Sequence, residues 1–285
     1  MAFSNLRANA MDYRELIGCA ALLLGGLTLF QLDSVAARKV GLGFVWLASG
    51  LGVHAISGSI LLSCAMLTAW VLFPLWEMVF VLRQLRVPRH RELADARAPR
   101  DEFEELSEIS GDMVDAGFEQ LDECRLRPAE HEQYYRIFIR KDGLVQSTIG
   151  YIAQGPIGFH FVAFTSQTKD GRRWVTWDYP LTYGLVMPPE TAVYRALYCQ
   201  SVSDLYQAHL DFLGANEITD DSLLFVEPTR DAARARLEEN LNQQIEYNIS
   251  RGFLAPATKM DNESFCYSWR GTLYVAGQVM RDLFF

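Results

Sequence analysis

Charged side chains are nearly absent from one long stretch of the sequence, residues 40–82. These 43 residues hold a single group with a full charge, Glu77, because His54 is expected to be neutral. A helix that crosses a bilayer needs roughly 20 apolar residues, so the stretch is long enough for two such helices. The scarcity of charge argues against a wholly soluble chain and predicts an integral membrane protein.

Cysteine is also scarce. The chain has five cysteines, which form neither a CxxC pair nor a Cys/His ligand spacing. An odd number of scattered cysteines is typical of reduced thiols rather than of a disulfide framework. This pattern favours a cytosolic position for the soluble part of the chain.

Recognisable motifs for catalysis, metals and phosphates are lacking. The sequence contains no GxSxG nucleophile motif, no glycine-rich phosphate loop and no cluster of metal-ligating side chains. We therefore predict no catalytic residue, no metal ion and no cofactor. His209 falls on the apolar face of a predicted helix and is interpreted as a core histidine.

The charges that are present divide the chain into two parts. Residues 1–100 carry ten Lys/Arg and six Asp/Glu, a net +4, whereas residues 101–285 carry 16 and 29, a net −13; together these give the −9 of the whole chain. An acidic soluble part argues against nucleic acid as a partner. We predict a transmembrane anchor with a basic juxtamembrane segment at 1–100 and a soluble cytoplasmic domain at 101–285.

The anchor is predicted to contain three spans. A first apolar run precedes the long stretch, and Ser57-Gly58-Ser59 is the most turn-like point within that stretch. The predicted spans are about 16–32, 40–56 and 60–82. Two alternatives stay open: two spans, with residues 41–52 lying partly at the interface, and a cleaved signal peptide in place of the first span.

Arginines follow the last predicted span and orient the chain. Positive side chains beside a span mark the cytoplasmic side of the membrane. We therefore predict a multi-pass protein of the cell (inner) membrane whose soluble domain is cytoplasmic and whose partners are the bilayer and a membrane or cytosolic protein. The residues predicted at the membrane interface are Arg83, Arg86, Arg89 and Arg91.

The soluble part is predicted to be an α+β domain. Period-two patterns and two Lys-Asp-Gly turns, at 141–143 and 169–171, predict an antiparallel sheet of about four to six strands with helices on one face. The predicted strands are 134–140, 144–153, 159–166 and 172–178, with additional strands at 119–126 and 192–199. The predicted helices are 101–116, 201–213, 229–250 and 271–283, the last of them apolar enough to dock on the sheet or on the membrane surface.

Aromatic residues gather in one predicted strand and its exit. Trp174, Trp177 and Tyr179, with Tyr183 beyond them, could line a ligand pocket beside a curved sheet. We take Trp174, Trp177, Tyr179 and His160 as candidate ligand-binding residues. Packing of the same side chains into the core is the alternative.

Four short motifs carry a loose resemblance. They are Gly117-Phe118, the run YRIF that starts at Tyr135, the run LYQAHL that starts at Leu205, and Trp269-Arg270-Gly271. On these motifs the soluble part resembles a group of uncharacterised bacterial membrane-anchored proteins with no established activity. The resemblance implies a bacterial source and an anchored domain, and it carries over no catalytic residue.

The sequence favours one function class over two others. The missing catalytic motifs and the aromatic strand favour a non-enzymatic binding or interaction module on a membrane anchor. The alternatives are a membrane-associated enzyme with an unrecognised active site and, with less support, a transporter or channel subunit in which Glu77 or His54 takes part.

Overall fold

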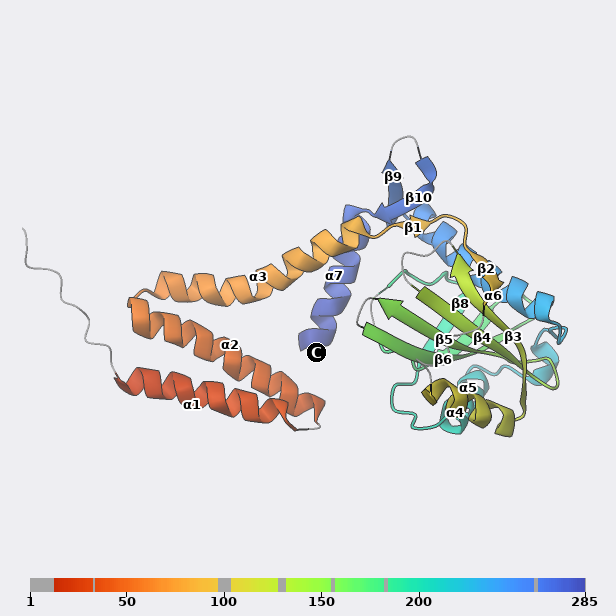
Figure 1. Ribbon diagram of the computed structural model, residues 1–285, viewed down its shortest axis with the longest axis horizontal. Coiled ribbons are helices and arrows are strands. Elements are labelled where there is room, and N and C mark those ends of the chain that lie inside the picture. Colours follow the sequence, from red (N-terminus) through yellow and green to blue (C-terminus); the bar gives the residue numbers. More distant parts are fainter. Residues whose placement is uncertain are drawn as a thin grey trace, which may run out of the picture. The chain divides into compact units, whose positions relative to one another are not determined.

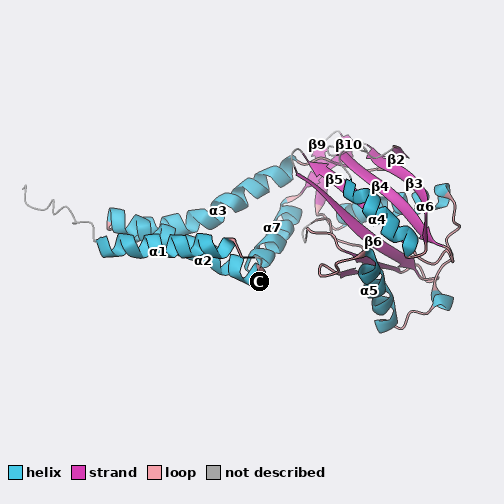
Figure 2. Ribbon diagram, turned by 60° about the horizontal axis from the view of Figure 1, so that its bottom comes forward, coloured by secondary structure: helices cyan, strands magenta, loops and turns pink. Residues whose placement is uncertain are grey.

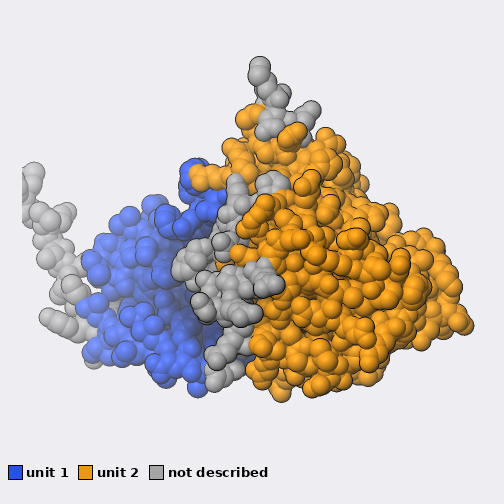
Figure 3. Space-filling view, turned by 45° about the vertical axis from the view of Figure 1, so that its right-hand side comes forward, with its two compact units in different colours: residues 1–82, 276–285 blue, residues 83–275 orange. Residues whose placement is uncertain are grey.

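The computed structural model describes residues 13–32, 34–96, 104–127, 132–154, 157–181, 184–258 and 261–284, so Tyr183 of the aromatic group lies outside the described residues. The chain divides into two compact units (Figure 3). The first comprises residues 1–82 and 276–285, and the second comprises residues 83–275. The juxtamembrane residues 83–96 thus belong to the second unit, whereas the sequence predicted a boundary at residue 100.

The first unit contains three apolar helices, α1 (Tyr13–Phe30), α2 (Val35–Ser57) and α3 (Ile60–Gln84, which ends just beyond the unit boundary) (Figure 1). The segments Ala36–Ser57 and Ile60–Gln84 are long and apolar enough to cross a membrane, whereas the apolar part of α1, Leu16–Phe30, is shorter. The predicted turn is confirmed, because α2 ends at Ser57 and is capped by Gly58, whose φ of 65° is left-handed.

Small residues let these helices approach closely. A Cβ on Gly26 of α1 would lie 2.8 Å from the carbonyl oxygen of Gly41 of α2, and a Cβ on Gly41 would lie 2.7 Å from that of Gly26. Between α2 and α3, the indole Nε1 of Trp46 donates a hydrogen bond to the carbonyl oxygen of Leu67 at 3.0 Å. Each apolar helix therefore packs on the next one.

The second unit is built on a seven-stranded sheet with the order β2-β3-β4-β5-β6-β7-β8. Its strands are β2 (Glu92–Asp95), β3 (Phe118–Arg127), β4 (Glu132–Arg140), β5 (Gln146–Gln154), β6 (Ile157–Gln167), β7 (Arg173–Trp177) and β8 (Thr191–Arg195). A separate three-stranded sheet has the order β1-β10-β9, from β1 (Val87–Pro88), β10 (Asp261–Tyr267) and β9 (Leu254–Thr258).

The α+β class is confirmed, but the strand count and strand direction differ from the prediction of four to six antiparallel strands. Strands β7 and β8 are parallel, while the other neighbours in the large sheet are antiparallel. Residues 178–190 separate these two strands, and a connection longer than a hairpin turn allows the chain to cross over and pair in parallel. Strand β2 escaped prediction because its four residues, ELAD, are too few to show a period.

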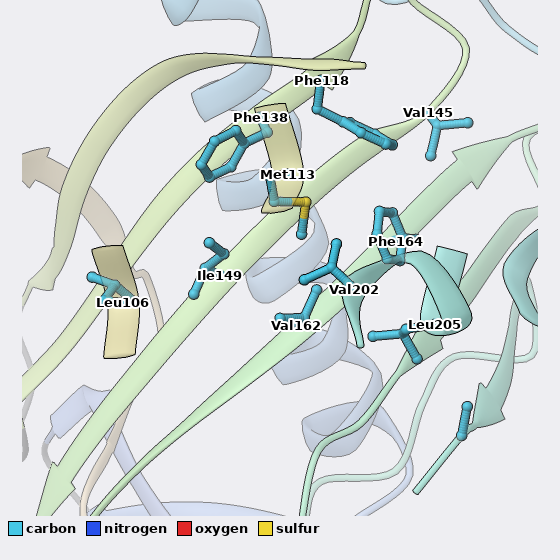
Figure 4. Packing of buried hydrophobic residues seen from close by; sticks show 11 residues of the cluster. Leu106, Met113, Phe118, Phe138, Val145, Ile149, Val162, Phe164, Val202 and Leu205 are labelled. Carbon is cyan, nitrogen blue, oxygen red and sulfur yellow. The ribbon is translucent and has the colours of Figure 1, made fainter. Parts of the chain in front are cut away.

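Helices cover both faces of the large sheet, not one face as predicted (Figures 1 and 2). Helices α4 (Glu104–Asp115) and α5 (Val202–Ala215) pack on one face, and α6 (Arg230–Ser250) packs on the other. Successive side chains of a strand point to opposite faces of the sheet. Both faces of this sheet carry apolar side chains, so helices cover both. Phe138, Ile149 and Phe164 point towards α4 and α5 (Figure 4). A short 3-10 helix (Asp220–Ser222) lies between α5 and α6. Helix α7 (Trp269–Phe284) follows the strands of the small sheet and is the last element.

The core histidine is confirmed. His209 of α5 is fully buried, with Nε2 3.1 Å from the Ser166 hydroxyl and Nδ1 2.9 Å from the Thr176 hydroxyl. Burial, with a smaller contribution from the charge of Arg140, lowers the pKa of His209 to about 4. The imidazole is therefore neutral at physiological pH and links α5 to two neighbouring strands.

The two Lys-Asp-Gly turns are confirmed, and they differ in their surroundings. Gly143 and Gly171 have φ values of 72° and 92°, a region that favours glycine. A Cβ on Gly143 would meet the Phe225 ring and lie 2.7 Å from the carbonyl oxygen of Val226, whereas a Cβ on Gly171 would meet nothing within 4 Å.

This difference predicts unequal effects of alanine. Gly171→Ala incurs only the left-handed backbone penalty, about 1 kcal/mol, whereas Gly143→Ala adds overpacking against Phe225 and is expected to cost about 3 kcal/mol in total. Thermal unfolding of the two variants beside the parent protein measures both effects. Equal destabilisation of the two variants would show that the contact of the added Cβ with Phe225 and Val226 does not affect stability.

Candidate ligand site beneath helix α6

A cavity of about 130 Å³ lies between the large sheet and α6. Side chains from the central strands form its floor, and Leu237 and Leu241 of α6 form its roof. Apolar side chains line the cavity both on the helix side and on the sheet side, where Phe161 and Ala163 of β6 lie. We call this space the α6 cavity; its wall is mainly apolar.

One end of the α6 cavity is polar. Arg173 and Thr191 stand opposite each other on the parallel strands β7 and β8, and both line the cavity. The guanidinium of Arg173 donates through one terminal nitrogen to the Asn240 side chain. Its Nε and the Thr191 hydroxyl are buried without a hydrogen-bond partner among the described residues. Such groups are rare in folded proteins and mark places where a ligand or water completes the bonding.

A second buried guanidinium lies close to the first. Arg236 of α6 is 8% exposed, and all three of its nitrogens lack a hydrogen-bond partner within the described part of the chain. Burial and, to a smaller extent, the charge of Arg173 lower the pKa of Arg236 to about 10, against the opposing influence of Glu239. Burial likewise lowers the pKa of Arg173, against the raising influence of Glu239 and Glu190. Two positive groups thus share this region while no described carboxylate forms an ion pair with either.

An open groove of about 530 Å³ adjoins this polar end. Arg173, Pro188 and Asn240 line both the groove and the α6 cavity. The outer wall of the groove is acidic, with Glu190 and Glu239. The groove therefore leads from solvent to the buried guanidinium of Arg173.

The structure brings together two of the four predicted ligand residues. Trp177 lines the α6 cavity, and the Tyr179 ring packs against it with centroids 5.3 Å apart. Trp174 points to the opposite face, where its ring lies 5.4 Å from that of Phe212. His160 is exposed on β6. An odd separation of three places Trp174 and Trp177 on opposite faces of one strand, so they cannot share a pocket.

The two guanidiniums were missed in the sequence, although both left a signal. Arg173 lies four residues before Trp177 in the same strand, hence on the same face. Arg236 lies three residues after Ala233 and one residue before Leu237, so it falls within the apolar face of its helix. A long cation inside an apolar stripe is the pattern to notice, because arginine is almost never fully buried unless it is paired.

The juxtamembrane residues 89–95 run antiparallel along α6. Alternate residues of this segment bond to helix residues that are spaced four apart. In order, the contacts are Arg89 with Glu246 (Nε to Oε1, 2.8 Å), the Arg91 backbone with the Asn242 amide (2.8 and 2.9 Å), the Leu93 amide with Glu238 (3.1 Å) and Asp95 with Arg234 (2.6 Å). We call these four contacts the juxtamembrane ladder.

Simple geometry explains why the ladder repeats. Two residues of a strand advance about 6.6 Å and four residues of an α-helix advance about 6.0 Å, so the two spacings match over this length. Burial lowers the pKa of Arg91, which the ladder places inside the unit. Of the arginines predicted at the membrane interface, Arg89 and Arg91 contact their own domain. Headgroup contact by Arg83 and Arg86 stays a prediction.

The last step of the ladder continues into a buried ion-pair network. The side chain of Asp122 on β3 is 3% exposed and pairs with Arg230 at 2.8 Å and Arg234 at 2.7 Å. Asp95 of β2 pairs with the same two arginines. The network therefore fastens the first turns of α6 to β2 and β3.

No group of three histidine, cysteine or carboxylate side chains among the described residues could hold a metal ion. Comparison with protein-family models, curated proteins and solved structures finds no match to this chain. The α6 cavity, with the guanidinium of Arg173 at its polar end, is therefore the feature on which a function can be based.

Proposed function

We propose that this chain is a membrane-anchored binding module whose α+β unit takes up a small organic anion in the α6 cavity. The apolar body of the ligand lies between Phe161, Trp177 and Leu237, and its anionic group lies against Arg173. The observation that carries the proposal is the buried guanidinium of Arg173 at the end of an apolar cavity, with no ion-pair partner and no hydrogen-bond partner for its Nε among the described residues.

The membrane anchor in this proposal consists of three spans, formed by α1, α2 and α3. The apolar surface of α3 supports this anchor. Large apolar side chains are exposed there: Leu61 is 75% exposed, Phe73 is 68% exposed and Trp76 is 68% exposed. The close glycine contact of α1 with α2 supports the inclusion of the shorter helix. The arginines that follow α3 support a cell-membrane protein with its soluble unit in the cytoplasm.

The charges around the α6 cavity support an anionic ligand. A buried cation without a counter-ion is unstable, and a carboxylate placed against Arg173 would supply the missing charge and an acceptor for its Nε. The glutamates of the groove are exposed and therefore strongly screened by water. They do not replace a bonded anion inside the cavity.

The lining favours binding over catalysis. Among the described residues, no histidine, cysteine or carboxylate lines the α6 cavity, so the acid and base groups that most enzymes use are missing there. Elsewhere, burial, with a smaller contribution from nearby Asp122, raises the pKa of the Cys124 thiol to about 12, so this cysteine remains protonated at neutral pH. The neutral His209 already bonds two core hydroxyls.

Thermal stabilisation by benzoate tests this function. A dry cavity of roughly 150 Å³ can hold benzene, so benzoate matches both the size and the charge of the site. Benzoate at high excess is expected to raise the unfolding temperature of the detergent-solubilised protein by about 5 °C or more, since a hundredfold excess over Kd adds about 3 kcal/mol. Neutral benzamide is expected to give a much smaller shift.

Three variants sharpen this test. Ala163→Leu fills the cavity and should abolish the benzoate shift, while Ala235→Leu on the exposed side of α6 should leave it unchanged. Arg173→Met should remove the difference between benzoate and benzamide. An equal shift by the two compounds in the parent protein would contradict anion recognition, and no shift by either would contradict an accessible ligand cavity.

A further inference from the structure

The start of helix α7 carries two large apolar side chains that the protein leaves uncovered. Trp269 is 60% exposed and Leu273 is 65% exposed, and a separation of four places them on one face of the helix. The opposite face is packed, with Thr272 and Val275 buried. Single exposed apolar residues are common in proteins, so this face needs an independent sign of what covers it.

Arg83 provides that sign. Its guanidinium lies 4.2 Å from the centroid of the Trp269 ring, in a cation–π contact. Arg83 belongs to the last turn of α3, whose 25 residues extend about 37 Å. The hydrocarbon layer is roughly 30 Å thick, so a spanning α3 carries Arg83 into the headgroup layer. The contact then holds Trp269 at the same level.

The charges beside this face complement an anionic membrane. Arg270 is exposed and its guanidinium stacks on the Phe253 ring at 4.9 Å, next to Trp269 in the sequence. Arg83 and Arg270 are thus two cations at the edge of an apolar face, in a chain whose net charge is −9. Tryptophan with arginine and leucine is the usual composition of a helix face that lies in a membrane interface.

We infer that the Trp269–Leu273 face of α7 lies in the headgroup layer of the bilayer, with Arg83 and Arg270 on anionic lipid phosphates. This inference rests on the proposed membrane anchor. If α3 crosses the bilayer, lipid headgroups are held next to this face at high effective concentration. The bilayer is therefore the occupant that we assign to the face. α7 is then a surface attachment that holds the binding unit against the membrane.

Photocrosslinking of the full-length protein tests the inference. Benzoylphenylalanine is placed, one position at a time, at Leu273, at Leu72 in the middle of α3 and at Ser203 on the exposed side of α5. The protein is reconstituted in vesicles of phosphatidylcholine with phosphatidylglycerol and irradiated, and adducts are identified by mass spectrometry. We expect lipid adducts at positions 273 and 72 and none at position 203.

Each other outcome has a distinct meaning. A lipid adduct at position 72 without one at 273 overturns the surface attachment and leaves the anchor intact. The absence of a lipid adduct at position 72 overturns the anchor, and the inference with it. A protein crosslink at 273 in place of lipid identifies another chain as the occupant and also overturns the inference.

Lipid charge provides a second readout on the same protein. The adduct yield at position 273 is expected to be several-fold higher in vesicles with phosphatidylglycerol than in phosphatidylcholine alone. The double variant R83Q/R270Q should remove this difference without changing the adduct at position 72. An unchanged charge dependence in the double variant overturns the assignment of these two arginines to lipid phosphates.

Discussion

Replacing Arg236 with methionine is expected to stabilise the ligand-free protein, whereas replacing Arg234, two residues earlier in the same helix, is expected to destabilise it. Both residues are arginines of α6 that reach towards the sheet. They differ in their partners: Arg234 pairs with Asp122 and Asp95, while Arg236 is buried without a hydrogen-bond partner in the described residues. The pair of variants therefore isolates the effect of a missing counter-ion.

The gain in the first variant comes from a desolvation penalty that nothing offsets. Arg236 is 8% exposed, and its lowered pKa reflects the disfavoured charge. Methionine keeps much of the volume of the stem and removes the charge. Replacement of buried charges by apolar groups of similar size stabilises proteins by 1–4 kcal/mol, so we expect about 2 kcal/mol, or about 4–8 °C in unfolding temperature.

The loss in the second variant comes from an orphaned carboxylate. Without Arg234, the buried Asp122 retains only Arg230 as an ionic partner, and Asp95 of β2 also loses one contact. Breaking a buried ion pair on one side costs about 3 kcal/mol. Scanning calorimetry in detergent measures both variants against the parent, and a shift of the same sign in the two would contradict the assignment of Arg236 as unpaired.

Acidification from pH 6.5 to pH 4 is expected to reduce the stability of the second unit by about 3 kcal/mol through His209 alone. The folded pKa of His209 is about 4, whereas an unfolded histidine titrates near 6.5. Between these values the unfolded chain binds a proton that the folded chain refuses. Stability is therefore intact above pH 6.5 and falls as the pH decreases towards 4.

A variant separates this contribution from that of the carboxylates. His209→Gln retains a donor and an acceptor for Ser166 and Thr176 but has no titrating group in this range. Denaturant unfolding of the parent and the variant at intervals between pH 4 and 7 gives the two profiles, and the variant is expected to have the flatter one. Parallel profiles would show that His209 is not the group that titrates.

Local chemistry is sufficient to predict much of this fold. The turn at Ser57-Gly58-Ser59 separates α2 from α3, and the two Lys-Asp-Gly turns close their hairpins. The caps of α5 and α6 are Ser201 and Thr229, whose hydroxyls accept from the third following amide. In each case a few neighbouring residues determine the backbone, so no knowledge of the tertiary structure is needed.

Elements that depend on distant partners could not be predicted in this way. Strand β2 forms because it pairs with β3 and because Leu93 and Asp95 bond to α6. The α6 residues that they contact lie more than a hundred positions later in the sequence. The parallel pairing of β8 with β7 depends on the path of an irregular segment. Neither is encoded by a periodic pattern within the element itself.

The candidate site was predicted only in part, for a different reason. Trp177 was found because aromatic residues are visible in a sequence, but its grouping with Trp174 ignored the alternation of a strand. Arg173 and Arg236 were overlooked because a charged residue is normally solvated. Their meaning emerges only when burial and the missing carboxylates are known, which requires the packed structure.

The juxtamembrane ladder also has a mechanical consequence. Its four contacts lie side by side along α6. A pull on Arg89 directed along the helix axis would therefore load all four together in shear, whereas a pull directed away from the helix would open them one after another. Because α6 also forms the roof of the α6 cavity, a pull of the first kind would act on that roof as a sliding force along the helix axis.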